Sequence, residues 1–316
     1  MSGFYPDWLA LREPADHAAR DGGLAAALAA RFAGRDAARI VDLGCGAGSN
    51  LRALMPYLPG RQHWTLVDWD PALLAAARER LAAWSDAATA EGEALRIEKD
   101  GRVATVTFRQ ADLTRDLPAC LEPTPDLVTA AALFDLVSAG WIATFAGELS
   151  ARRVPLYTVL TYDGTERWSP PHPLDGAVLA AFHAHQGGDK GFGPAAGPKA
   201  GAALEQAFAA AGYTVDTAAS PWRLGDESRA LVGELAAGIA AAAVEAGGVS
   251  AADGAAWAQA RRAASAVVGH VDILAWGGRP GAPAQAPPPP HPPPPPPSPG
   301  GSPPPRGGGE RPDTPK

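Results

Sequence analysis

The chain has 316 residues and a formal net charge of −7, a balance that disfavours non-specific binding to nucleic acid. Cys45 and Cys120 lack the spacing of metal ligands, so we expect no metal site and two reduced thiols. No apolar run is long enough to span a membrane and the N-terminus lacks a signal-peptide pattern, which favours a cytoplasmic protein without membrane contact.

The composition changes abruptly near residue 280. Of the 33 prolines, 18 lie in residues 280–316, where few apolar side chains are available to form a core. We expect this segment to be a disordered Pro/Gly-rich tail. The residues before it are numerous enough for one large α/β domain.

The folded part alternates between helical and strand-like patterns. Helical patterns come first, at residues 7–20 and 23–33. They predict that residues 1–36 form an N-terminal helical cap. Strands are predicted at residues 39–43, 63–67, 95–98, 103–110, 127–132, 155–162, 213–218 and 271–276. Helices are predicted between them at residues 50–57, 71–83, 200–211 and 226–246. Residues 163–198 are expected to form a loop-rich insertion.

Two features of this order define the sheet. Lys99-Asp100-Gly101 joins the strands at 95–98 and 103–110, and Asp-Gly between alternating segments predicts a hairpin. Strands that alternate with helices predict a doubly wound, mostly parallel α/β sheet. In such sheets, ligands bind at the carboxyl ends of the strands. The residues that follow each strand are therefore the first candidates for a functional site.

Residues 40–50 carry the clearest motif in the chain. An apolar run ends in Asp42 and is followed by Gly44, Gly46 and Gly48. Glycine lets the backbone turn sharply and approach a ligand without a Cβ in the way. The helix that follows adds unpaired N–H groups at its N-terminus, so this turn predicts a nucleotide-binding element.

The spacing of the glycines separates two ligand classes. A dinucleotide site requires G-x-G-x-x-G, and the third glycine would fall on Ser49 in this chain. Asp42 and the three glycines instead resemble motif I of the class I S-adenosylmethionine-dependent methyltransferases, (D/E)-x-G-x-G-x-G. The resemblance extends over about residues 7–278 and implies that S-adenosyl-L-methionine is the methyl donor. Asn50, where the next helix begins, belongs to the expected donor site.

The resemblance also implies a fold. It predicts a Rossmann-like, doubly wound sheet of seven strands, mostly parallel with the last strand antiparallel, and with helices on both faces. Residues 37–279 would form the methyltransferase domain. The hairpin between the second and third strands of this domain departs from the family pattern.

Further donor contacts are implied at the end of the strand at 63–67. The two carboxylate oxygens of Asp68 suit the ribose hydroxyls, although NAD sites place an acid at a similar offset. Asp70 fits the alternative function of a helix N-cap better than Asp68 does. Trp69 lies where members of this family often place a residue that packs on adenine. The alternative interpretation of Trp69 is a core residue.

Later strands supply the rest of the expected donor site. Asp112 resembles the acid that accepts a hydrogen bond from the adenine amine, and the N–H of Leu113 would reach an adenine ring nitrogen. The alternative function of Asp112 is a helix N-cap. Ala131 belongs to a run of small residues whose backbone would line the methionine portion of the donor. Arg12 could pair with the carboxylate of the donor or form a surface salt bridge.

The acceptor side is expected in the insertion at 163–198, which would act as a lid. Its catalytic candidates are His183, His185 and Asp163. A histidine can act as general base for an oxygen or nitrogen nucleophile. Two histidines two residues apart indicate a metal only when further ligands are nearby, and no such pattern is evident. The alternative for each of these residues is a surface or lid position.

Together these features favour methyl transfer from S-adenosylmethionine to an oxygen or nitrogen atom of a small molecule. No Asn-Pro-Pro-Tyr or Asp-Pro-Pro-Tyr follows residues 127–132, which argues against enzymes that methylate amino groups of DNA. One alternative is an NAD(P)-dependent oxidoreductase, which Ser49 and Asp112 disfavour. The other is a non-catalytic S-adenosylmethionine-binding protein. The sequence identifies neither the acceptor nor the oligomeric state.

Overall fold

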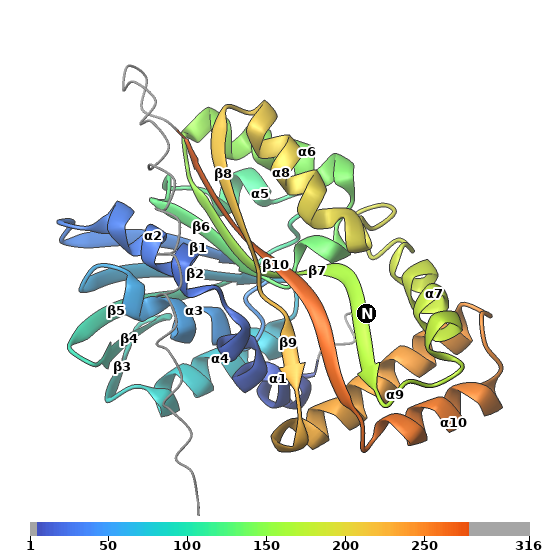
Figure 1. Ribbon diagram of the computed structural model, residues 1–316. Coiled ribbons are helices and arrows are strands. Elements are labelled where there is room, and N and C mark those ends of the chain that lie inside the picture. The colour runs from blue at the N-terminus through green and yellow to red at the C-terminus, as the bar shows by residue number, and fades with distance from the viewer. Residues whose placement is uncertain (1–4, 278–316) are drawn as a thin grey trace, which may run out of the picture. The chain divides into compact units, whose positions relative to one another are not determined.

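The computed structural model describes residues 5–277, so the expected tail at 280–316 lies outside the described residues. The strands form one sheet, in the order β3-β4-β5-β2-β1-β6-β7-β10-β8, and β9 pairs with β10 (Figure 1). The strands are β1 Ala37–Leu43, β2 Arg61–Asp68, β3 Ala87–Glu91, β4 Ala94–Lys99, β5 Arg102–Gln110, β6 Leu127–Ala131, β7 Leu156–Ser169, β8 Tyr213–Ala219, β9 Trp222–Leu224 and β10 Ser265–Gly277.

Helices connect these strands. The α-helices are α1 Pro6–Ala19, α2 Gly22–Phe32, α3 Ser49–Leu54, α4 Pro71–Trp84, α5 Leu117–Cys120, α6 Ala139–Arg152, α7 Asp175–Gln186, α8 Ala200–Ala210, α9 Arg229–Glu245 and α10 Ala251–Arg261. The short 3-10 helices are η1 Met55–Tyr57, η2 Phe134–Leu136, η3 Gly197–Lys199 and η4 Asp226–Ser228. None of the helices within residues 5–277 combines the length and the apolar character needed to cross a membrane.

The centre of the sheet is parallel and its last strand is antiparallel, as the resemblance implies. β5, β2, β1, β6 and β7 pair in parallel in that order. β10 lies between β7 and β8 and runs antiparallel to both. An all-parallel dinucleotide-binding sheet has no such inserted strand. The doubly wound fold class is therefore confirmed, including its antiparallel last strand.

The strand count differs from the expectation, because the sheet has ten strands rather than seven. The three additional strands are β3, β4 and β9. β4 forms the predicted hairpin with β5, and its turn places Asp100 and Gly101 at φ of 49° and 74°, as a tight turn of this type requires. β3 extends that hairpin by pairing with β4, and its residues are exposed, so no burial pattern marks it in the sequence.

The insertion at 163–198 is not loop-rich, and this expectation is wrong. β7 continues through Ser169 because its later residues pair with β10, as far as Ser265 opposite Ser169. α7 then occupies much of the remaining insertion. α9 and α10 lie beside the extended ends of β7 and β10 (Figure 1), and the rings of Trp168 and Trp257 are in edge contact at 5.3 Å. These contacts give the insertion a packed interior.

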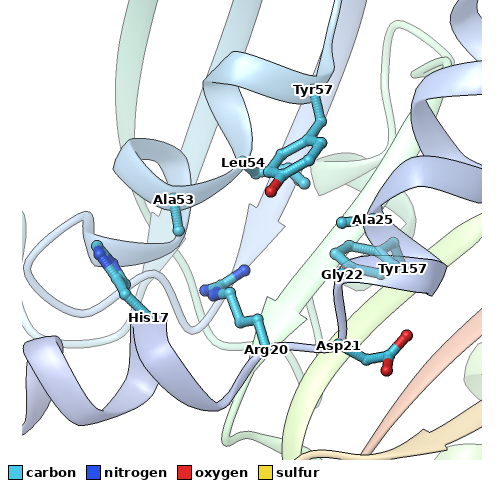
Figure 2. Close-up of a pocket in the computed structure, with 9 residues that line it drawn as sticks. All are labelled: His17, Arg20, Asp21, Gly22, Ala25, Ala53, Leu54, Tyr57 and Tyr157. Carbon is cyan, nitrogen blue, oxygen red and sulfur yellow. The ribbon is translucent and has the colours of Figure 1, made fainter.

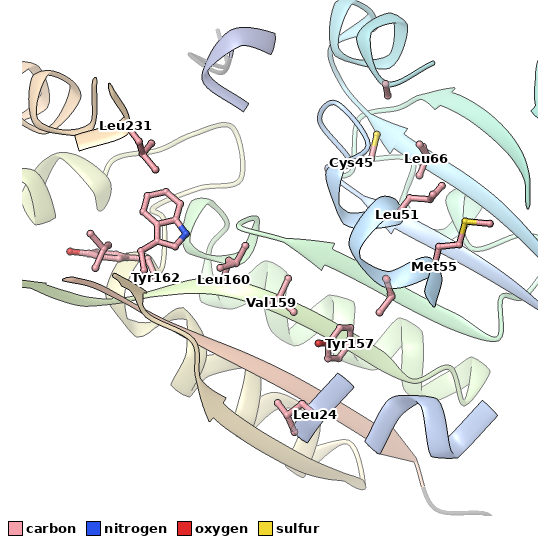
Figure 3. Packing of buried hydrophobic residues seen from close by; sticks show 14 of the residues in the cluster. Leu24, Cys45, Leu51, Met55, Leu66, Tyr157, Val159, Leu160, Tyr162 and Leu231 are labelled. Atoms are coloured by element: carbon pink, nitrogen blue, oxygen red, sulfur yellow. The ribbon is translucent and has the colours of Figure 1, made fainter. Parts of the chain in front are cut away.

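Buried apolar side chains pack on both faces of the sheet. One cluster joins α2, α3 and β7 through residues such as Leu24, Leu51 and Tyr157 (Figure 3). The other joins η2, α6 and α8, where the ring of Phe145 lies 5.4 Å from Phe134 and 5.9 Å from Phe208. Helices on both faces hold the carboxyl ends of β1, β2, β5 and β6 at one edge.

Candidate functional site

The glycine loop leaves β1 and enters α3 in the predicted place. Gly46 has a φ of 51°, a left-handed backbone conformation that favours glycine. A Cβ at this position would lie 3.0 Å from a terminal carbon of Leu9 in α1. Gly44 has a φ of 62°, and a Cβ there would lie 3.1 Å from Leu133 after β6. Neighbouring elements therefore approach the loop closely enough that glycine is needed.

Asp68 connects the end of β2 to this loop. Its Oδ2 atom accepts a hydrogen bond from the Gly46 N–H at 2.9 Å, and its Oδ1 atom accepts one from the Asp70 N–H at 3.0 Å. Burial raises the pKa of the Asp68 carboxyl. Each carboxylate oxygen can accept a further hydrogen bond, so Asp68 remains available to a ligand. Asp70 caps α4 by accepting from the Ala72 N–H at 2.8 Å, which is the function that the sequence indicates for it.

Asp42 supports the loop from within the sheet. The Asn50 side-chain amide donates to Asp42 Oδ1 at 2.7 Å and to Thr129 Oγ1 at 3.0 Å. The Arg20 guanidinium in turn donates to Asn50 Oδ1 at 2.8 Å. Burial raises the pKa of Asp42 to about 7, although the Asn50 hydrogen bond opposes this. Asp42 and Asn50 thus fix the start of α3 relative to β1 and β6.

A cavity of about 190 Å³ lies beside this network. Figure 2 shows Arg20 between His17 and Tyr157 at this cavity, with Tyr57 on the α3 side. None of the expected donor residues lines it. The cavity is therefore separate from the strand-end edge at which the glycine loop lies.

Asp112 and Trp69 lie at the same edge as Asp68. Asp112 Oδ1 accepts hydrogen bonds from the Thr114 N–H at 2.9 Å and from the Thr114 hydroxyl at 2.6 Å. These two hydrogen bonds lower the pKa of Asp112, and the positive charge of Arg115 lowers it further by a smaller amount. The Leu113 N–H has no hydrogen-bond acceptor among the residues that the structure describes. Trp69 is 61% exposed, so its interpretation as a core residue is wrong.

Arg12 is buried, so its interpretation as a surface salt bridge is wrong. Its Nε and Nη2 atoms donate to the two carboxylate oxygens of Asp16 at 2.9 and 3.1 Å. Its guanidinium also lies 5.0 Å from the ring centroid of Trp222, whose indole N–H donates to Asp16 at 3.0 Å. Arg12 is therefore already engaged by a carboxylate of its own helix.

The helix that carries Arg12 is fastened to the glycine loop. Glu13 accepts two hydrogen bonds from the Arg52 guanidinium of α3, at 2.8 and 2.6 Å. The His17 Nε2 atom lies 2.9 Å from the Ser49 hydroxyl. Ser49 thus opens α3, at the position where a dinucleotide site has glycine. The sequence gives no local signal for these contacts, because they join residues more than 30 positions apart.

The three catalytic candidates do not come together. His183 and His185 lie on different sides of α7, as a spacing of two residues on a helix requires. The His183 Nε2 atom lies 2.9 Å from the Tyr162 hydroxyl, whereas His185 Nε2 lies 3.3 Å from Glu245 on α9. Asp163 is exposed and accepts from the Thr165 N–H at 2.7 Å. Within residues 5–277, no three His, Cys, Asp or Glu side chains are grouped so as to hold a metal.

Other titratable residues occupy the interior near His183. The Tyr162 hydroxyl donates to Glu166 at 3.2 Å, and burial raises the pKa of Glu166 to about 7. Burial lowers the pKa of His270 to about 3 and raises that of Asp135 to about 6. The sequence analysis singled out neither Glu166 nor His270. One signal was available for Glu166. Side chains alternate between the two faces of a strand, so Tyr162, Glu166 and Trp168 lie on the same face if β7 continues beyond residue 162.

Residues 40–152 match a family model described as a methyltransferase domain. Among curated proteins, none matches the chain closely enough to count as a relative. Similar solved structures include YcgJ of Bacillus subtilis, with 13% identity, a TM-score of 0.45 and coverage of 81% of this chain and 99% of that one. A putative methyltransferase from Bacillus halodurans has 13% identity, a TM-score of 0.42 and coverage of 82% and 100%. Human N-acetylserotonin methyltransferase, solved with SAM, has 14% identity, a TM-score of 0.40 and coverage of 87% and 54%.

Proposed function

Because the chain belongs to the class I S-adenosylmethionine-dependent methyltransferases, we propose that it transfers the donor's methyl group to an oxygen or nitrogen atom of a small molecule. S-adenosylmethionine is its methyl donor, and the chain is an enzyme of this class. The acidic net charge of −7 supports a small-molecule acceptor over nucleic acid.

The hydrogen bond from the Gly46 N–H to Asp68 is the observation that carries the donor assignment. It holds a carboxylate beside the glycine loop, at the edge where open α/β sheets bind ligands. We assign the ribose hydroxyls to Asp68, and one face of the adenine ring to the exposed indole of Trp69. Asp112 and the Leu113 N–H would receive the polar edge of adenine.

The remaining donor contacts are assigned to the loop and to β6. Gly44, Gly46 and Gly48 would bring the backbone against the methionine portion, and the backbone of Ala131 would line its other side. Asp42 and Asn50 act from beneath by holding the loop in place. Arg12 would have to leave Asp16 in order to bind the donor's carboxylate, so we do not assign that contact to it.

The protein does not need to activate the methyl group, because a methyl carbon bonded to a sulfonium sulfur is already electrophilic. The residues mainly align the nucleophile, the methyl carbon and the sulfur, and exclude water from them. α1 contributes to this exclusion by lying over Gly46. An acceptor that carries a proton also requires a base.

Isothermal titration calorimetry with S-adenosylhomocysteine and with NAD tests the donor assignment. We expect micromolar binding of S-adenosylhomocysteine and no measurable binding of NAD. The reverse result would indicate an oxidoreductase. A screen of metabolites with radiolabelled donor then identifies the acceptor, and donor binding without transfer to any compound would indicate a non-catalytic binder.

A further inference from the structure

A buried polar cluster lies on the acceptor side of the donor edge. We define the acceptor-side cluster as Arg12 of α1, Asp135 of η2, Tyr162 of β7, Trp222 of β9 and His270 of β10. Arg12 lies over the Trp222 ring at 5.0 Å, and the Trp222 and His270 rings are 5.1 Å apart. Tyr162 and His270 are paired across β7 and β10, with ring centroids 6.2 Å apart. These contacts join residues of four elements, and η2, which carries Asp135, packs against β7.

Two atoms of this cluster are buried without a partner. Asp135 Oδ1 and His270 Nδ1 have no hydrogen bond to any residue in the range 5–277. Buried polar atoms in native proteins are nearly always paired, so each exception calls for an explanation such as a ligand or water. Asp135 lies in η2, directly after β6, and therefore at the strand-end edge to which the donor is assigned. A ligand held at this edge could supply the missing partner.

The charges around Asp135 leave it free to act as a base. The positive charge of Arg12 opposes the effect of burial on the pKa of Asp135. Arg12 is bonded to Asp16, however, so Asp135 has no ion pair of its own in the described chain. The charge of Asp135 also contributes to the raised pKa of Tyr162, after burial, Glu166 and Asp163. His270 is neutral at physiological pH, since burial lowers its pKa to about 3.

We propose that Asp135 is the catalytic base, which removes the proton from a hydroxyl group of the acceptor, and that the neutral His270 ring offers this acceptor a second hydrogen bond. The inference rests on the proposed function and narrows it to methylation at oxygen. A carboxylate suits a hydroxyl donor, while the unpaired ring nitrogen of a neutral histidine can donate or accept. Asp163, which is exposed, and His185, which lies against Glu245 of α9, are not needed for this step.

The step balances without a further reactant. The hydroxyl oxygen forms a bond to the methyl carbon while the bond from that carbon to the sulfonium sulfur breaks. The electron pair of the broken bond stays on sulfur, which becomes a neutral thioether. The hydroxyl proton passes to the Asp135 carboxylate, and the protonated carboxyl later releases it to solvent.

The test compares Asp135→Asn with a matched control, Asp226→Asn. Asn keeps the shape of Asp but accepts no proton, and Asp226 is an exposed residue of η4 whose side chain is 93% accessible. Calorimetry with S-adenosylhomocysteine reports folding and donor binding for both variants. Labelled methyl transfer to a panel of hydroxylated compounds reports the chemical step. We expect Asp135→Asn to lower kcat roughly 100-fold or more, with donor affinity within twofold of wild type, and Asp226→Asn to leave both unchanged.

Two further readouts separate a base from a structural residue. The kcat/KM of the wild type is expected to decrease as the pH drops below about 6, because Asp135 then becomes protonated. The kcat/KM of Asp135→Asn should not show this decrease. Acceptors with an acidic hydroxyl, such as nitrophenols, need less help from a base, so the variant should recover much of its activity on them. A variant that retains kcat within threefold, or that loses donor affinity together with kcat, would overturn the inference.

The outcomes also separate this inference from the proposed function. If wild type does not bind S-adenosylhomocysteine, the proposed function fails. If it binds but methylates only amines, or no hydroxylated compound in the panel, the assignment of Asp135 fails while the donor site stands.

Discussion

The carboxylate of Asp68, the last residue of β2, accepts a hydrogen bond from the Gly46 N–H in the middle of the glycine loop, at 2.9 Å. Two segments that are separate in the sequence are thereby fixed relative to each other before any ligand binds. Such preorganisation lowers the entropic cost of binding. The donor site is therefore expected to be most sensitive to substitution at this residue.

Asp68→Ala should weaken binding of S-adenosylhomocysteine by about 100-fold, or about 2.7 kcal/mol, because both the proposed contact with the ribose and the hydrogen bond to the loop are lost. Asp70→Ala removes the cap of α4 instead, so it should cost about 1 kcal/mol of stability with little change in donor affinity. Calorimetry and thermal melting distinguish the two variants. Equal losses of affinity would mean that the ribose lies elsewhere.

The raised pKa of Asp42 predicts how the stability of the protein depends on pH. Its pKa is raised to about 7 in the folded state, chiefly by burial, from an ordinary value near 4. The folded state therefore binds a proton more tightly than the unfolded state, and this contribution to stability is lost as the pH rises from about 4 to about 7. Asp42→Asn should remove this loss, so its melting temperature should exceed that of wild type at pH 8 but not at pH 4.5. A constant difference across this range would argue against the titration of Asp42.

The Glu13–Arg52 ion pair is predicted to hold α1 against α3. The Arg52 side chain is only 6% exposed and donates twice to one carboxylate. Lysine cannot make this two-bond contact, so Arg52→Lys should lower stability by about 1–3 kcal/mol and increase hydrogen exchange in α1. Arg96→Lys, at a half-exposed pair with Glu98, is the control and should change stability by less than about 0.5 kcal/mol. Similar effects of the two substitutions would show that burial of the pair does not matter.

Removal of residues 280–316 should leave donor affinity and the melting temperature nearly unchanged. The proline- and glycine-rich composition offers few apolar side chains that could pack on a domain. The truncated and full-length chains can be compared by calorimetry and differential scanning fluorimetry. A fall of more than about 5 °C, or a tenfold loss of affinity, would show that the tail contributes to the folded state.

The parts of the molecule that sequence reasoning predicted well are those with local causes. The glycine loop, the Asp-Gly hairpin and the cap at Asp70 each depend on residues within a few positions of one another. The extension of β7 was missed because it depends on β10, about 100 residues later in the chain. The acceptor-side cluster draws on five elements, and no short segment contains two of its members. Asp163, His183 and His185 were grouped by their nearness in sequence, which neither strand nor helix geometry preserves.

Arg12 and Glu13 are neighbours on α1 and contact two different places. Arg12 lies against Trp222 in the acceptor-side cluster, and Glu13 is bonded to Arg52 behind the glycine loop. A rigid helix cannot move one of these residues without moving the other. If the donor binds at the glycine loop and the acceptor at this cluster, we expect the two binding free energies to be coupled through α1, and the coupling to be reciprocal.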